Sequence, residues 1–181
     1  MERGEGTLDP MAMGNIMLYN HLAYYAHLLG NASAAGYAQT GIKLARERGS
    51  LSLHPFLYST SGEIALANGD LDAAEEYFRN GLTLAEQTPL LVAVAGLTAN
   101  LGLVAKARGQ GDAAREQLQK ALILVQPLGN YHLEARILIW LAPLLAAEDA
   151  RASLHDARVL AEKGGLKGLL EEIGDLEMDL P

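Results

Sequence analysis

The sequence predicts an all-α fold in which helical hairpins follow one another along the chain as an α-solenoid. Three observations predict it. A segment repeats itself at a distance of 40 residues, the matching positions are small or apolar at helical spacing, and no stretch of strand length alternates apolar with polar residues. The chain has 181 residues, 50% of them hydrophobic and 20% charged. It is therefore long and apolar enough to bury a sizeable core, and we do not expect disorder.

The repeat is clearest when residues 57–84 are placed on residues 97–124. The identical pairs are Leu57/Leu97, Gly62/Gly102, Ala65/Ala105, Ala67/Ala107, Gly69/Gly109, Asp72/Asp112, Ala73/Ala113, Ala74/Ala114, Glu76/Glu116, Leu82/Leu122 and Leu84/Leu124. A two-helix unit explains them, with a first helix over about 54–68, a turn at Gly69-Asp70 and a second helix over about 71–86. Small residues at Gly62 and Ala74 are expected where the two helices approach closely. Asp70 is expected to cap the second helix, and Asp112 to do the same in the next hairpin.

The same pattern continues on both sides of this pair. It predicts four hairpins, over residues 11–48, 54–87, 94–127 and 134–163. Pro143 falls inside an apparently helical run and is expected to kink or end that helix, because its ring and missing N–H disrupt the hydrogen-bond ladder. Residues 166–181 are expected to form an acidic capping helix and tail, which would stop the stacking of a solenoid. Residues 1–10 are expected to be a flexible tail.

These hairpins resemble the tetratricopeptide repeat, a helix–turn–helix unit of about 34 residues. The residues that carry the resemblance are Tyr58-x2-Ser61-Gly62-x2-Ala65 with Ala74-x3-Phe78, and Thr98-x2-Leu101-Gly102-x2-Ala105 with Ala114-x3-Leu118. The prolines that close the family's repeat come late here, at Pro89 and Pro127. The longer period is similar to repeats of maltose-regulator-type and related ATP-dependent LuxR-family bacterial regulators. The resemblance covers about residues 12–163 and implies a right-handed solenoid that binds proteins or peptides.

In that family the first helix of each hairpin lines a concave groove that binds ligands. The resemblance implies these groove residues: Tyr19, Asn20, His27, Glu63, Asn100, Leu103, Lys106 and Trp140, with Ala23, Ser59, Thr60, Ile139 and Pro143 on the same surface. The amides of Asn20 and Asn100 each offer a donor and an acceptor, which suits an extended peptide, although both residues are also tolerated in ordinary helices. Trp140, the only tryptophan, fits either a core position or an interface hot spot.

No catalytic or cofactor chemistry is expected. Cysteine is absent, and no two of the five histidines have the spacing of a zinc protease. Gly109-Gln110-Gly111 has no strand before it and no Lys-Ser/Thr after it, so it is not a phosphate loop. No serine or threonine nucleophile can be paired with a base. The sequence thus predicts a protein that is not an enzyme and holds no metal or cofactor.

Charge and hydropathy limit the partners and the location. The net charge of −8 disfavours direct binding to nucleic acid or to an anionic membrane surface. Two stretches, residues 10–42 and 87–105, hold no Asp, Glu, Lys or Arg, but both carry polar residues that disfavour a membrane span. The start of the sequence lacks the pattern of a signal peptide. We expect a cytoplasmic protein.

The uncharged N-terminal hairpin predicts self-association. Apolar residues surround the predicted first helix, and such a helix is normally buried on more than one side. The residues expected to make the contact are Met13, Met17, Tyr24 and Leu28. A homodimer would cover them. The alternatives are that further repeats upstream of the given sequence cover them, or that residues 1–9 fold back as a lid. Two functions therefore stay open: a protein- or peptide-binding module, as in the sensory part of a bacterial signalling or transcriptional regulator, or a self-association unit with no separate ligand.

Overall fold

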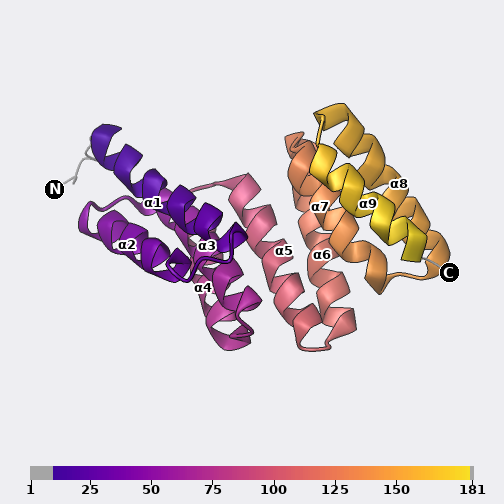
Figure 1. The fold of residues 1–181 in the computed structure, drawn as a ribbon, viewed down its shortest axis with the longest axis horizontal. Helices are drawn as coiled ribbons and strands as arrows, with labels where there is room; N and C mark the ends of the chain where they lie inside the picture. Colours follow the sequence, from indigo (N-terminus) through magenta and orange to yellow (C-terminus); the bar gives the residue numbers. More distant parts are fainter. Residues whose placement is uncertain (1–9, 180–181) are drawn as a thin grey trace. The chain divides into compact units, whose positions relative to one another are not determined.

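A computed structural model describes residues 10–179, and this part of the chain folds into nine α-helices without a β-strand (Figure 1). The helices are α1 (Pro10–Leu28), α2 (Ala34–Glu47), α3 (His54–Ala67), α4 (Leu71–Gln87), α5 (Leu91–Ala107), α6 (Gly111–Val125), α7 (Tyr131–Leu141), α8 (Ala147–Gly164) and α9 (Lys167–Asp179). The predicted all-α fold of successive helical hairpins is confirmed. The tail expected at residues 1–10 lies outside the described residues except for Pro10, which begins α1.

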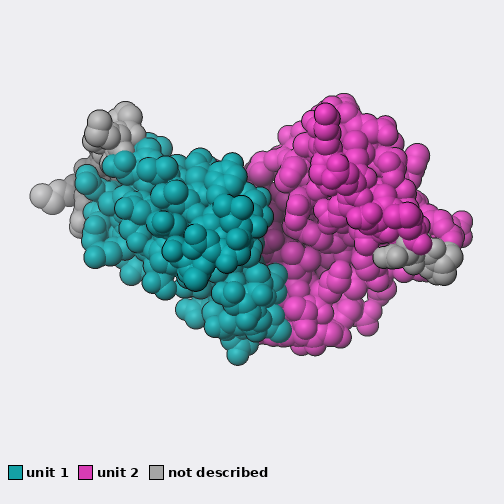
Figure 2. Space-filling view, in the orientation of Figure 1, with its two compact units in different colours: residues 1–89 teal, residues 90–181 magenta. Residues whose placement is uncertain are grey.

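The chain forms two compact units, residues 1–89 and residues 90–181 (Figure 2). In unit 1, the hairpin of α1 and α2 is followed by the hairpin of α3 and α4, and α3 packs on α2. In unit 2, the hairpin of α5 and α6 is followed by that of α7 and α8, and α9 packs on α8. Within each unit, therefore, a new hairpin begins on the second helix of the hairpin before it. Within residues 10–179, no helix combines the length and apolar character that crossing a bilayer requires.

Small residues set the close contacts inside the hairpins. A Cβ added at Gly62 of α3 would overlap the ring of Phe78, which is fully buried on α4. At the matching position in unit 2, a Cβ added at Gly102 would lie 3.0 Å from Cγ of Leu118. The large side chain of the second helix thus occupies the space that glycine leaves on the first. This is the close approach that the repeat predicted at Gly62.

The turn between α3 and α4 follows the predicted residues. Gly69 adopts a left-handed φ of +79°, a conformation that glycine accepts without strain. The N–H groups of Gly69 and Asp70 donate to the carbonyls of Leu66 and Ala65 and so satisfy the end of α3. Asp70 then caps α4, because its carboxylate accepts a hydrogen bond from the N–H of Ala73 at 3.1 Å.

The prediction that Asp112 caps α6 is wrong. The residue at the cap position is Gln110, whose side chain makes no capping hydrogen bond, and Gly111 already belongs to the helix. Asp112 lies in the first turn, where its Oδ1 is 2.7 Å from Nη2 of Arg115. The physical reason is the repeat distance itself, since a shift of 40 residues places Gln110 on Asp70.

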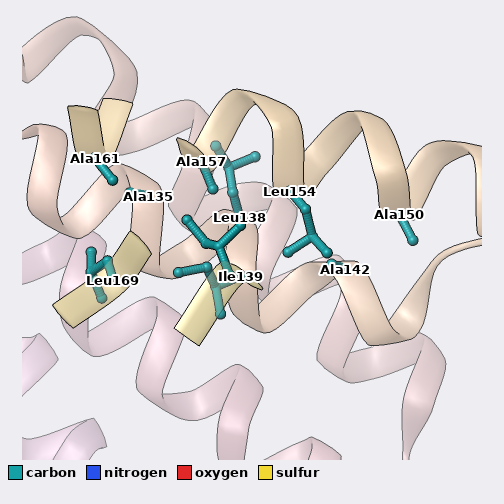
Figure 3. Packing of buried hydrophobic residues seen from close by; sticks show 10 residues of the cluster. Ala135, Leu138, Ile139, Ala142, Ala150, Leu154, Ala157, Ala161 and Leu169 are labelled. Carbon is teal, nitrogen blue, oxygen red and sulfur yellow. The ribbon is translucent and has the colours of Figure 1, made fainter. Parts of the chain in front are cut away.

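Unit 2 ends in a layer of alanines and leucines. The hydrophobic core between α7, α8 and α9 is shown in Figure 3 and consists of Ala135, Leu138, Ile139, Ala142, Ala150, Leu154, Ala157, Ala161, Leu169 and Ile173. As predicted, Pro143 ends the regular helix, because α7 stops at Leu141 and Ala142–Leu144 forms a 3-10 turn. The predicted C-terminal helix is α9, which buries Leu169 and Ile173 in this core.

Candidate functional site

The surface of unit 1 is hollowed between α2 and α4, with α3 as the floor; we call this hollow the α2–α4 cleft. It has two adjoining parts of about 220 Å³ and 450 Å³, which share Gln39 and Tyr77. The smaller part is lined mostly by small residues, namely Ala35, Ala38, Ser61, Ile64, Ala65, Asn68, Asp70 and Ala73. The larger part is lined by longer side chains, namely Ile42, Lys43, Arg46, Glu47, Tyr58, Glu76 and Asn80.

Two tyrosine rings form part of the wall of the larger hollow. Tyr58 of α3 and Tyr77 of α4 have ring centroids 6.2 Å apart, and His54 continues the row, with its centroid 5.9 Å from that of Tyr58. The ring of His54 is held in place because its Nδ1 donates to the carbonyl of Ser50 at 2.8 Å. Both tyrosines are half-buried, so each keeps part of its surface open to a ligand.

Side chains of both charges and an amide line the hollow around these rings. Lys43, Arg46 and Glu47 come from α2, and Glu76 and Asn80 come from α4. Nζ of Lys43 is 3.9 Å from Oε1 of Glu47. Amide side chains at this surface can pair with a peptide backbone, since each carries a donor and an acceptor. The cleft is thus equipped to hold an extended segment that carries apolar side chains.

In unit 1, the predicted groove residues do not line this cleft. Tyr19 lines a further hollow between α1 and α2, of about 610 Å³, together with Leu18 and Leu22. This hollow adjoins the larger part of the cleft, with which it shares Lys43 and Glu47. Asn20 is half-buried, and its Oδ1 is enclosed without a hydrogen-bond partner. His27 is half-buried in the last turn of α1. On α3, Oε1 of Glu63 accepts a hydrogen bond from Ser59 at 3.0 Å.

In unit 2, the predicted groove residues differ in exposure. Asn100 of α5 is only 5% exposed, Leu103 is half-buried and Lys106 is exposed near the helix end. Trp140 of α7 is half-buried against two hydrophobic clusters, and the guanidinium of Arg136 lies 5.0 Å from its ring centroid.

Besides Asn100, which is buried on α5, three more residues assigned to the groove surface belong to the interior instead. Ala23 is fully buried in a cluster with alanines of α2, Thr60 is buried on α3, and Ile139 is buried in the core that α8 and α9 share with α7. Their assignment to an open surface is wrong. The cause is that each first helix is covered on more than one side, so position along the helix alone does not identify the open face.

The first helix and Leu29, the residue after it, expose a broad apolar surface, which we call the α1 face. Its exposed residues are Met13, Leu18, Leu22, Tyr24, Tyr25, Leu28 and Leu29. The opposite side of α1 buries Ile16, Ala23 and Ala26. Three of the predicted self-association residues therefore lie on the open side, whereas Met17 is half-buried against the cluster around Ile16.

Sequence reasoning did not single out Gln39 and Tyr77, which join the two parts of the α2–α4 cleft. Gln39 lies on α2 and Tyr77 on α4, and neither belongs to the repeat motif. The only available signal was Tyr58, which occupies the aromatic position at the start of that motif.

Comparison with known proteins adds little to this description. No protein-family model matches the chain, and no curated protein matches it. Among solved structures, the crystal structure of BtubC (BKLC) from P. vanneervenii is similar, with 14% sequence identity and a TM-score of 0.39. The match covers 94% of this chain and 88% of that chain. A likeness of this size supports no inference about function.

Proposed function

We propose that this chain is a non-catalytic module of the tetratricopeptide-repeat type that binds a protein or a peptide. The observation that carries the proposal is the α2–α4 cleft. It combines two partly open tyrosine rings with a floor of small residues and a border of amides and charges. Aromatic side chains in a concave surface are typical anchors for a partner's apolar residues.

The chemistry of the cleft favours an extended peptide over a small polar metabolite. The larger part, about 450 Å³, has room for several side chains, and the smaller part continues it past Gln39. Gln39 and Asn80 can each pair with a backbone amide. Lys43 and Glu76 present opposite charges, so a partner segment with mixed charges would be matched better than a strongly acidic or basic one.

Selection from a random peptide library on the immobilised full chain tests this function, followed by measurement of affinity by fluorescence anisotropy. We expect Tyr77→Ala to weaken the selected peptides about tenfold or more, as loss of an aromatic anchor does. Tyr131→Ala is the matched control, since Tyr131 is a half-buried tyrosine of unit 2, and it should leave the affinity unchanged.

A third variant tests whether the peptide binds in the α2–α4 cleft or in the groove that the resemblance implies. Lys106→Glu changes an exposed groove residue of α5 and should have little effect if the peptide lies in the α2–α4 cleft. Loss of affinity in Lys106→Glu but not in Tyr77→Ala would move the site to the predicted groove. Failure to select any peptide above background would contradict peptide binding itself.

We also propose the setting, a cytoplasmic bacterial signalling or transcriptional regulator in which this module is the sensory or interaction part. The support is the repeat distance of 40 residues, which resembles the repeats of such regulators.

A second function, self-association into a homodimer through the N-terminal hairpin, is favoured by a different observation. The α1 face is apolar and exposed, and patches of this kind mark contact surfaces in soluble proteins. This function needs no ligand and is compatible with the first.

A further inference from the structure

One side of the exposed face of α1 corresponds, position by position, to faces of α3 and α7 that are buried. Gly30 and Gly69 both have a left-handed φ, and the N–H of each donates to the carbonyl three residues earlier, at His27 and Leu66. Superposing these two turns aligns α1 with α3, and the repeat distance extends the alignment to α7. The aligned sets are Leu18, Leu22 and Tyr25 on α1, Leu57, Ser61 and Ile64 on α3, and Ile137 and Leu141 on α7 with Leu144 in the 3-10 turn that follows it.

On α3, Leu57 and Ile64 pack against the preceding helix, α2. Leu57 is fully buried, and a Cβ added at Gly41 of α2 would come within 2.6 Å of its Cδ2. Ile64 is buried in a cluster with Ala34 and Ala38 of α2.

On α7, the preceding helix covers the same positions again. Ile137 and Leu141 are buried in one cluster with Leu118, Ala121 and Val125 of α6. On both α3 and α7, therefore, these positions pack against the preceding helix. That helix presents small or apolar residues at intervals of four and three.

On α1 these positions are open. Leu18 is 53% exposed, Leu22 39%, Tyr25 62%, and Leu29, directly after the helix, 82%. We call these four residues the α1 stripe. Their spacing of four, three and four residues is that of a coiled-coil seam, which receives a second helix. The α1 stripe is therefore a helix-binding surface without a helix on it among the described residues.

We propose that a second copy of this chain occupies the stripe, with the two α1 helices packed against each other about a two-fold axis. The distribution of charge along the chain supports a second copy as the occupant. The chain carries a net charge of −8, which opposes contact between copies at most of its surface, yet residues 10–42 hold no Asp, Glu, Lys or Arg. A two-fold axis brings the same patch of both copies together, and an uncharged apolar stripe is complementary to itself.

The size of the surface also fits. The four side chains of the α1 stripe and the three other exposed apolar side chains of the α1 face together offer on the order of 700 Å² of accessible area, against about 800 Å² per partner in a standard interface. A contact of standard size would therefore be centred on the stripe and extend over the rest of the α1 face. The proposal rests on the second function above, because it specifies how the homodimer forms.

Single cysteines test the stripe directly, because the chain has none of its own. Leu22→Cys and Tyr25→Cys lie in the middle of the stripe, where a two-fold axis brings equivalent residues together in either helix direction. Ile123→Cys is the control, at a residue of α6 that is 70% exposed. Under mild oxidation we expect at least one stripe variant to form a cross-linked dimer about tenfold or more faster than the control, since a disulfide requires Cα atoms within about 7 Å.

Light scattering at tens of micromolar measures the assembly without cross-links. We expect a dimer for the unmodified chain and for Ile123→Glu, and a monomer of unchanged helicity for Leu22→Glu combined with Tyr25→Glu. Both stripe residues are exposed, so this double variant should still fold.

The outcomes distinguish failure of the proposed contact at the α1 stripe from failure of self-association, the function on which it rests. A monomeric unmodified chain would overturn both. A dimer that survives the double glutamate variant and cross-links no faster at the stripe than at Ile123 would overturn the stripe while keeping self-association. A monomer that binds an added peptide of residues 33–48, which is α2 with its two cap residues, would show that the stripe takes a different helix and would overturn the second copy as its occupant.

Discussion

At the scale of single residues, the space at helix crossings controls stability. We predict that Gly62→Leu destabilises the fold by about 1–3 kcal/mol, because the new side chain must displace the buried ring of Phe78. Gly174→Ala is the matched control inside α9, where an added Cβ meets no atom within 4 Å. It should stabilise by up to about 0.5–1 kcal/mol through helix propensity. Urea unfolding followed by circular dichroism measures both, and a neutral result at Gly62 would mean that α3 and α4 do not meet there.

A second residue-scale prediction concerns Glu134 in the first turn of α7. Burial raises the pKa of this carboxyl, the nearby Asp156 raises it further, and Lys163 opposes the shift. A raised pKa means that folding penalises the ionised form, so the penalty is present at neutral pH and disappears as the pH falls through the unfolded value near 4.5. Glu134→Gln should therefore stabilise the protein at pH 7 and have little effect in acid.

The Asp156→Asn background provides the control for Glu134. Removing the Asp156 charge takes away one cause of the raised pKa, so the gain from Glu134→Gln should be smaller there. Chemical denaturation of the unmodified chain, both single variants and the double variant, at neutral and acidic pH, gives the free energies of unfolding required. A gain that is equal at both pH values would show that the effect does not arise from ionisation.

At the scale of elements, the α3–α4 and α5–α6 hairpins differ in the N-cap of their second helix. Substitutions can remove the cap from α4 and add one to α6. Asp70 caps α4 through the N–H of Ala73, whereas Gln110 makes no capping bond at α6. We predict that Asp70→Ala costs about 0.5–2 kcal/mol and that Gln110→Asp stabilises by up to about 1 kcal/mol. Thermal unfolding of both variants measures the changes. A loss of stability in Gln110→Asp would contradict the equivalence of the two positions.

The helices could be predicted from the sequence wherever a turn carried its own chemical signal. Gly69 with Asp70 fixed the boundary between α3 and α4 to within a residue, and Pro143 marked the end of α7. The error at Asp112 arose where the sequence offers an acidic residue in the first turn but none at the cap. Local signals thus locate the ends of helices. Which residues of two repeats are equivalent must instead be read from the alignment of the whole repeat, which pairs Asp70 with Gln110.

The candidate site was harder to predict, because it depends on which faces remain open after packing. Ala23 and Ile139 lie on the helices expected to line a groove, but neighbouring helices bury both. Gln39 and Tyr77 come together only once α2 and α4 have packed on α3, and no pattern in the sequence links them. The apolar character of α1 could be recognised from the sequence, whereas its open stripe became visible only through comparison with α3 and α7.

At the scale of the whole molecule, the distribution of charge predicts how salt acts on the proposed dimer. Each copy carries a net charge of −8, while the proposed contact is made by a hairpin with no formal charge between residues 10 and 42. Added salt screens the repulsion between the two copies and removes no attraction at the contact, since no ion pair is formed there. We therefore predict that the dimer becomes tighter as sodium chloride rises from about 0.01 M to 0.15 M, where the screening length falls from about 30 Å to 8 Å. Sedimentation equilibrium across this range measures the change. A dimer that weakens with salt would show that charged residues make the contact, and that α1 is not its centre.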